Sequence, residues 1–70
     1  MNAEQLLTKA INTLNRWDTE LAEEGEEVPM INKAMITIIE YALANLDNRQ
    51  SAPVRNAIAL AYAVLEVDEY

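Results

Sequence analysis

The fold is decided by residues 6–25, which read LLTKAINTLNRWDTELAEEG. Apolar residues recur in this stretch at alternating intervals of three and four, which is the spacing of one face of a bundle helix: Leu7, Ala10, Leu14, Trp17 and Leu21. Polar side chains occupy the opposite side. The pattern predicts an amphipathic helix that packs through one face.

Both ends of this helix carry recognisable signals. Asn2 is a good N-cap, and Gln5 follows three residues later, as in a partial capping box. Gly25 is the only glycine of the chain and suits the left-handed conformation in which many helices end. The first helix is therefore expected over about 3–24.

Two further helices are predicted downstream. Pro29 suits a first helical turn, and the apolar spacing after it predicts a helix over 29–47. The face expected to point to the core is made of Ile31, Met35, Ile38, Ile39, Ala42 and Leu46. Ser51 is a candidate N-cap with Pro53 in the turn that follows, which predicts a third helix over 52–67.

The third segment has a strand as its alternative, because it contains Val, Ile, Tyr and Leu. Alanine at positions 57, 59, 61 and 63 favours the helix, since alanine is the best helix former and a poor strand residue. Breaks of roughly four residues make neighbouring helices antiparallel. We predict a single all-α domain over 1–70, a three-helix up-down-up hairpin bundle completed by dimerisation.

Composition excludes several function classes. The 70 residues carry Lys+Arg 5 against Asp+Glu 12, a net charge of -7, and are 51% hydrophobic. This is too apolar for a disordered acidic tail and too acidic for direct binding to nucleic acid or to an anionic membrane. The chain has no His, no Cys and a single serine, so we expect no enzyme activity, no catalytic residue, no cofactor and no metal site.

Three negative features bear on location. No apolar run approaches the length of a membrane span, and the first residues lack the cationic start of a signal peptide. The absence of cysteine fits a reducing compartment. The expected location is cytoplasmic.

The second and third helices have more apolar surface than a three-helix core can use. In the third helix the apolar side chains sweep about 220° of the circumference. Such a surplus predicts a second chain, and a homodimer is the form we favour. The expected interface is Met30, Tyr41, Ala57, Leu60, Ala61, Val64 and Val67. Exposure of alanine to solvent costs little, so the alanines of this arc do not by themselves indicate a partner.

Acidic residues are unevenly distributed. In an up-down-up bundle nine of the twelve would gather at one end, here called the acidic pole: Asp18, Glu20, Glu23, Glu24, Glu26, Glu27, Glu66, Asp68 and Glu69. Acidic side chains at the C-terminal end of a helix are unfavourable, because they oppose the helix macrodipole. Residues that are unfavourable for local structure often have a function instead. The pole either binds a partner or only keeps an apolar protein in solution.

The first function hypothesis is a small acidic interaction protein without enzyme activity. It would bind and inhibit or modulate a larger protein with a basic surface, in the manner of a phage or mobile-element inhibitor, which includes nucleic-acid mimicry. The alternative is a structural subunit or assembly module that uses the apolar faces of the second and third helices. Affinity that falls steeply with salt is expected from the first and not from the second.

Overall fold

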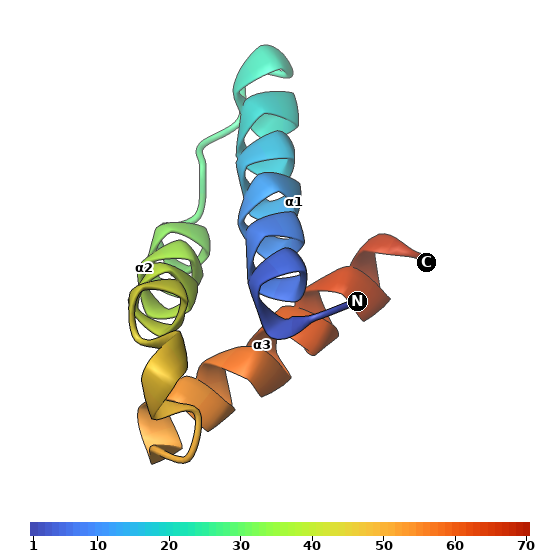
Figure 1. Ribbon diagram of the computed structural model, residues 1–70. Helices are drawn as coiled ribbons and strands as arrows, with labels where there is room; N and C mark the ends of the chain where they lie inside the picture. Colours follow the sequence, from blue (N-terminus) through green and yellow to red (C-terminus); the bar gives the residue numbers. More distant parts are fainter.

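The computed structural model describes residues 1–70 and consists of three α-helices and one short 3-10 turn (Figure 1). Helix α1 spans Ala3–Glu23, α2 spans Met30–Ala44, η1 spans Leu46–Asn48 and α3 spans Ala52–Asp68. The predicted all-α three-helix bundle is confirmed, including the helical interpretation of the third segment.

The two ends of α1 follow local rules. The side chain of Asn2 accepts a hydrogen bond from the Gln5 backbone N–H at 2.8 Å, and the Gln5 side chain accepts one from the Asn2 backbone at 3.1 Å, so the capping box is complete. At the other end Gly25 has a φ of 78°. The backbone N–H of Glu26 donates to the Leu21 carbonyl at 2.9 Å, which is the Schellman arrangement that a glycine permits.

The ends of α2 and α3 differ in detail from the prediction. Pro29 is the N-cap of α2 rather than a member of its first turn, and α2 ends at Ala44 because the chain tightens into η1. Ser51 occupies the N-cap position of α3, but its hydroxyl donates to the Asn48 carbonyl at 2.9 Å and caps nothing. Pro53 lies in the first turn of α3 as expected.

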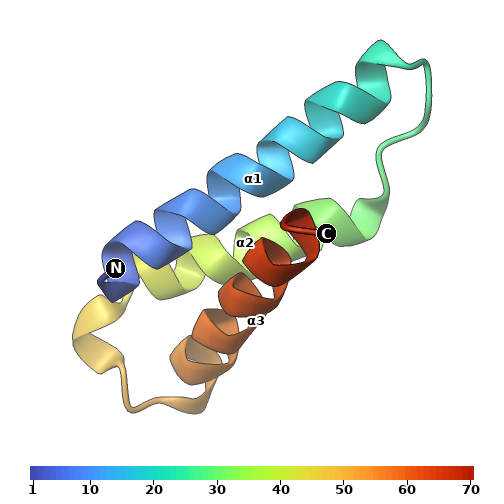
Figure 2. The same cartoon turned by 90° about the vertical axis from the view of Figure 1, so that its right-hand side faces the viewer.

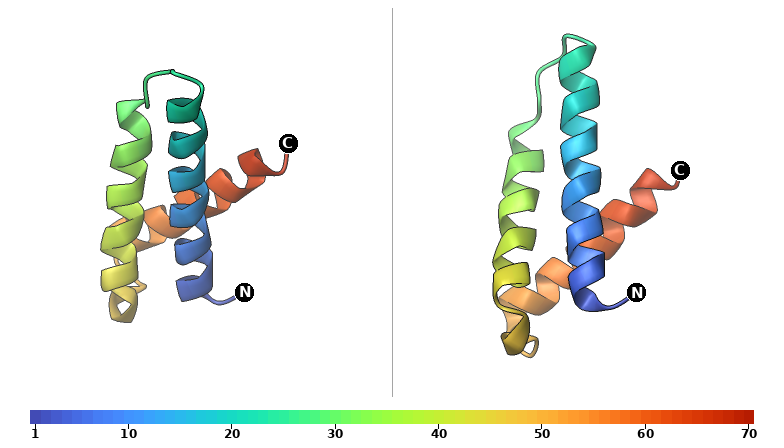
Figure 3. Two further views of the ribbon diagram at one scale, coloured as in Figure 1. Left: turned by 90° about the horizontal axis from the view of Figure 1, so that it is seen from above. Right: turned by 45° about the horizontal axis from the view of Figure 1, so that its top comes forward.

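Helices α1 and α2 form an antiparallel hairpin, and α3 crosses one face of it obliquely (Figures 2 and 3). The crossing runs from the C-terminal end of α2 to the middle of α1, where Asp68 meets Arg16 and Trp17. The bundle is therefore not a set of three nearly parallel axes. One consequence is that α3 does not cover the end of the hairpin that carries the α1–α2 loop.

The core is built where the three helices meet. Its largest fully buried side chains are Leu7 and Leu14 from α1, Ile39 from α2 and Val54 from α3. Small residues complete the α3 contact, because Ala57 and Ala61 are also fully buried. Alanine at these positions lets the α3 backbone lie close to the hairpin.

The inward face of α2 is turned relative to the predicted stripe. Asn32 is buried, whereas Ile31 is 63% exposed and Ile38 is 46% exposed. The expectation that Ile31 and Ile38 are core residues is therefore wrong. The physical reason is the oblique course of α3, which leaves that side of α2 without a covering helix.

The chain has more surface than its mass requires. Its accessible area is 4837 Å², whereas a compact protein of this mass exposes about 4,400 Å². The dimensions of 40 × 21 × 14 Å show an elongated molecule. Only 12 of 70 residues are buried, so apolar residues outside this core remain available for contact with another molecule.

Candidate protein-binding surface

The α1–α2 loop presents exposed carboxylates at the uncovered end of the hairpin. Glu23 closes α1, Glu24 and Gly25 form the turn, and Glu26 and Glu27 lie in the extended segment before α2. All four glutamates are exposed, and the ion pairs of the chain involve none of them. We call these four residues the loop acids. Because their charges are unpaired, this end of the molecule has a negative field that a cationic partner can neutralise.

The C-terminal end of α3 is fixed to α1 by one carboxylate. Asp68 accepts hydrogen bonds from the Arg16 guanidinium and from Trp17 Nε1, the latter at 2.9 Å. Both bonds lower the pKa of the Asp68 carboxyl below its ordinary value, and the bond from Arg16 has the larger effect. The Arg16–Asp68 hydrogen bond also raises the pKa of Arg16. Arg16 also lies 3.7 Å from Glu20, one helical turn further along α1.

The acidic residues that the sequence assigned to one pole divide into separate places. Glu66 and Glu69 lie with Lys9 and Leu6 beside the N-terminal half of α1, away from the loop acids. Asp68 is the partner of Arg16. The prediction of a single pole of nine acids is therefore wrong, because one group lies at the loop end of the hairpin and a second group lies on α3. The reason is that α3 crosses the hairpin obliquely and does not run up to the loop.

Asp18 makes a contact between α1 and α2 and is therefore not one of the free surface acids. Its carboxylate accepts a hydrogen bond at 2.8 Å from the side-chain amide of Asn32, which is buried on α2. This contact joins α1 to α2 just below the loop. Neither it nor the Arg16–Asp68–Trp17 contact was predicted. Asn32 shares its side of α2 with Met35 and Ile39, and a polar residue on this apolar side is the one signal that would have pointed to the first.

A small apolar groove opens where α3 departs from the hairpin. It has a volume of about 160 Å³ and is lined only by apolar side chains: Trp17, Met35, Leu60, Ala63, Val64 and Val67. Glu20 and Glu24 follow Trp17 by three and seven residues, so they lie on the same side of α1 as the groove. The apolar hollow thus opens on the side of α1 that carries Glu20 and Glu24.

The residues predicted for a dimer interface are found in two environments. Ala57, Ala61 and Val64 are buried in the chain's own core, so they pack against the hairpin and not against a second chain. Their assignment to an interface is corrected, because the close approach that alanine permits is used by α3 itself. Four remain accessible, namely Met30, Tyr41 and Val67, which are exposed, and Leu60, which is partly buried in the groove.

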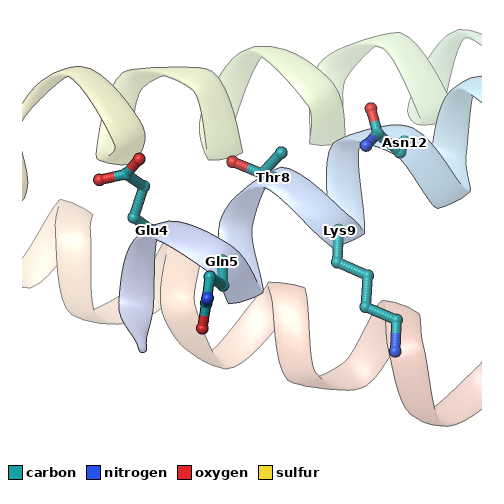
Figure 4. Close-up of a pocket in the computed structure, with 5 residues that line it drawn as sticks. All are labelled: Glu4, Gln5, Thr8, Lys9 and Asn12. Carbon is teal, nitrogen blue, oxygen red and sulfur yellow. The ribbon is translucent and has the colours of Figure 1, made fainter. Parts of the chain in front are cut away.

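A larger hollow on the N-terminal half of α1 has no comparable chemistry. Its five lining residues, all polar, come from this one helix, and Figure 4 shows their side chains spreading apart: Glu4, Gln5, Thr8, Lys9 and Asn12. The Gln5 side chain is already used in the capping box. No set of groups converges there on a common point.

Two further properties concern the whole chain. No group of three or more acidic side chains lies close enough together to hold a metal ion. None of the three helices combines the length and the apolarity needed to cross a membrane.

Comparison of the chain with protein-family models, with curated proteins and with solved structures finds no match.

The Arg16–Asp68 contact leads to a prediction about pH. Because the folded-state pKa of Asp68 is below its ordinary value of 3.8, the ionised carboxylate stabilises the fold at neutral pH, and this stabilisation is lost as the pH falls through the folded-state value. Asp68→Asn is therefore expected to be less stable than the wild type at neutral pH, with the difference shrinking in acid. Urea unfolding of both proteins, from neutral pH to below the ordinary carboxyl pKa of 3.8, measures this difference in stability.

Glu69→Gln is the matched control, since it removes one charge from the same helix end without removing a hydrogen bond of that side chain. The prediction would be contradicted if the stability difference between Asp68→Asn and the wild type stayed constant as the pH was lowered.

Proposed function

We propose that the chain is a non-enzymatic interaction protein that binds a larger protein through the loop acids and the apolar groove, and thereby inhibits or modulates it. The observations that support this proposal are four exposed, unpaired glutamates in the α1–α2 loop and a hollow lined only by apolar side chains, which opens on the Trp17 side of α1. The complementary ligand is a basic segment with one large apolar side chain. The carboxylates steer and orient it, and the groove takes up the apolar group.

A basic surface of this kind is typical of proteins that bind nucleic acid. Occupation of such a surface by an acidic protein blocks access of DNA or RNA, which is the mode of action that we propose in preference to a role in catalysis. The analogy with phage or mobile-element inhibitors rests on size, charge and the lack of catalytic groups.

The test is reversal of the loop acids. The immobilised chain captures its partner from a lysate of the native host, and titration then measures the affinity. Replacing Glu23, Glu24, Glu26 and Glu27 by lysine is expected to weaken binding by about 100-fold or more, since four attractive contacts become repulsive. Wild-type affinity should also fall steeply as salt is raised.

The control reverses four acids elsewhere on the surface, namely Glu4, Asp47, Glu66 and Glu69, so that the net charge changes equally. This variant is expected to keep most of the affinity. Equal losses in both variants would show that only bulk charge matters, and unchanged affinity in the loop variant would overturn the proposal.

A second function is favoured by the exposed apolar residues of α2. Met30, Ile31, Ile38 and Tyr41 are between 46% and 87% exposed on one helix. We propose as the alternative a structural or assembly module in which this helix face makes the contact and the acids only solubilise. Affinity that is nearly indifferent to salt would favour this alternative over the first.

A further inference from the structure

The buried side of α3 ends in a charged residue. Its buried positions are spaced by three and four residues, as on one face of a helix: Val54, Ala57, Ala61 and Val64. The next position of this series is Asp68, the last residue of α3, where the spacing would place an apolar side chain. Its carboxylate faces α1, because it accepts hydrogen bonds from Arg16 and from Trp17 Nε1.

The last turn of α3 depends on this contact. Its own charges are unfavourable, because Glu66, Asp68 and Glu69 lie at the negative end of the helix macrodipole and the turn contains no basic residue. Val67 is exposed, and only Leu65 packs partly against the core. The two bonds of Asp68 are the only side-chain hydrogen bonds that join α3 to the hairpin.

Arg16 has a second acceptor on its own helix. Its Nη2 donates to Asp68, while its Nε lies 3.7 Å from Glu20 Oε1, one turn further along α1. The side chain of Arg16 is 53% exposed, so both ion pairs are open to water and ions. The guanidinium therefore stays paired with Glu20 when it leaves α3, which makes loss of the Asp68 contact less costly.

We propose that Asp68 is a releasable latch: its bonds to Arg16 and Trp17 hold the last turn of α3 against α1, and when they are lost that turn unwinds while the rest of the bundle stays folded. The trigger is competing charge, since ions screen an exposed ion pair. The rest of α3 stays in place because its buried residues, up to Val64, pack against the hairpin without the latch. The inference concerns the chain by itself and does not rest on the proposed function.

Release of the latch changes the apolar groove. Val67 lines the groove and lies in the turn that unwinds, directly before Asp68. Trp17 lines the groove as well, and release deprives its Nε1 of the acceptor on Asp68. The closed latch therefore supplies one wall of the groove and fixes the indole, whereas the open latch removes that wall and leaves the indole free to turn.

Amide hydrogen exchange of the intact chain, followed by NMR, tests the latch residue by residue. Arg16→Gln removes the charged donor without altering the sequence of α3. It is expected to lower the protection of the amides of residues 66–69 about threefold to tenfold. The amides of Ala57 and Ala61 are expected to keep wild-type protection. Arg49→Gln is the matched control, since Arg49 is exposed, has no ion-pair partner and carries the same charge.

Salt and Glu20 supply a second test. Raising NaCl to about 1 M is expected to lower the protection of residues 66–69 in the wild type and to have little further effect in Arg16→Gln. Glu20→Gln leaves Arg16 with Asp68 as its only acceptor, so protection of the last turn is expected to rise. Quenching of the single tryptophan by acrylamide is expected to increase in Arg16→Gln and not in Arg49→Gln.

Three results would overturn the latch. The first is wild-type protection of residues 66–69 in Arg16→Gln. The second is an equal loss of protection at Ala57 and Ala61, because the contact would then stabilise the whole fold and release nothing locally. The third is lower protection in Glu20→Gln, because Glu20 would then support the Asp68 contact and not compete with it.

Discussion

Leu14→Ala is expected to lower the free energy of unfolding by about 3 kcal/mol. Leu14 is fully buried in the cluster that joins all three helices, and its truncation leaves a cavity in one of the few well-packed places of this molecule. A domain of 70 residues has a stability of about 4–10 kcal/mol, so the variant loses a large share of it. Urea unfolding followed by far-UV circular dichroism measures the change.

Leu21→Ala is the matched control from the same predicted stripe. Leu21 is only partly buried, and it lies in the last turn of α1, at the loop end of the hairpin. We expect a loss of less than about 1.5 kcal/mol, since truncation of a partly exposed side chain creates no closed cavity. Equal losses for Leu14 and Leu21 would contradict the oblique crossing of α3.

The features that sequence predicted correctly depend on neighbours in the chain. The Asn2–Gln5 capping box, the Gly25 turn and Pro53 at the start of α3 each involve residues within a few positions of one another. Their energies are local, so they can be evaluated before any tertiary contact is known. The existence and approximate bounds of the three helices follow from them and from the apolar spacing.

The features that the sequence did not predict depend on the angle at which α3 crosses the α1–α2 hairpin. Apolar spacing shows which sides of a helix are apolar, but not which of them a neighbouring helix covers. On α2 it could not separate Ile39, which is buried, from Ile38, one position away and exposed. That difference is fixed by the direction in which α3 crosses, and this direction is set by the packing of side chains from distant parts of the chain.

The candidate site shows the same division. The loop acids could be identified from sequence, since they are contiguous and follow a predicted turn. The place of Glu66 and Glu69 could not, because it depends on where the C-terminal end of α3 lies against α1. The apolar groove is likewise a product of the crossing, as its residues come from all three helices.

The crossing itself can be tested at Ala61, a residue of α3 that is fully buried against the hairpin. Ala61→Leu adds three carbon atoms where α3 lies against the hairpin, and such overpacking costs about 2–3 kcal/mol. To make room, α3 must move away from α1, so the hydrogen bond between Trp17 Nε1 and Asp68 is expected to break as well. Urea unfolding measures the first effect, and the emission maximum of the single tryptophan reports the second.

Ala59→Leu is the control on the same helix, since Ala59 is exposed and a larger side chain there meets only solvent. Its stability is expected to lie within about 0.5 kcal/mol of the wild type, with unchanged tryptophan emission. If Ala61→Leu were as stable as Ala59→Leu, alanine would not be required at the crossing, and α3 would be free to take another angle across the hairpin. Loss of stability together with altered emission only in Ala61→Leu would show that the small buried residues of α3 hold the helix in its oblique course.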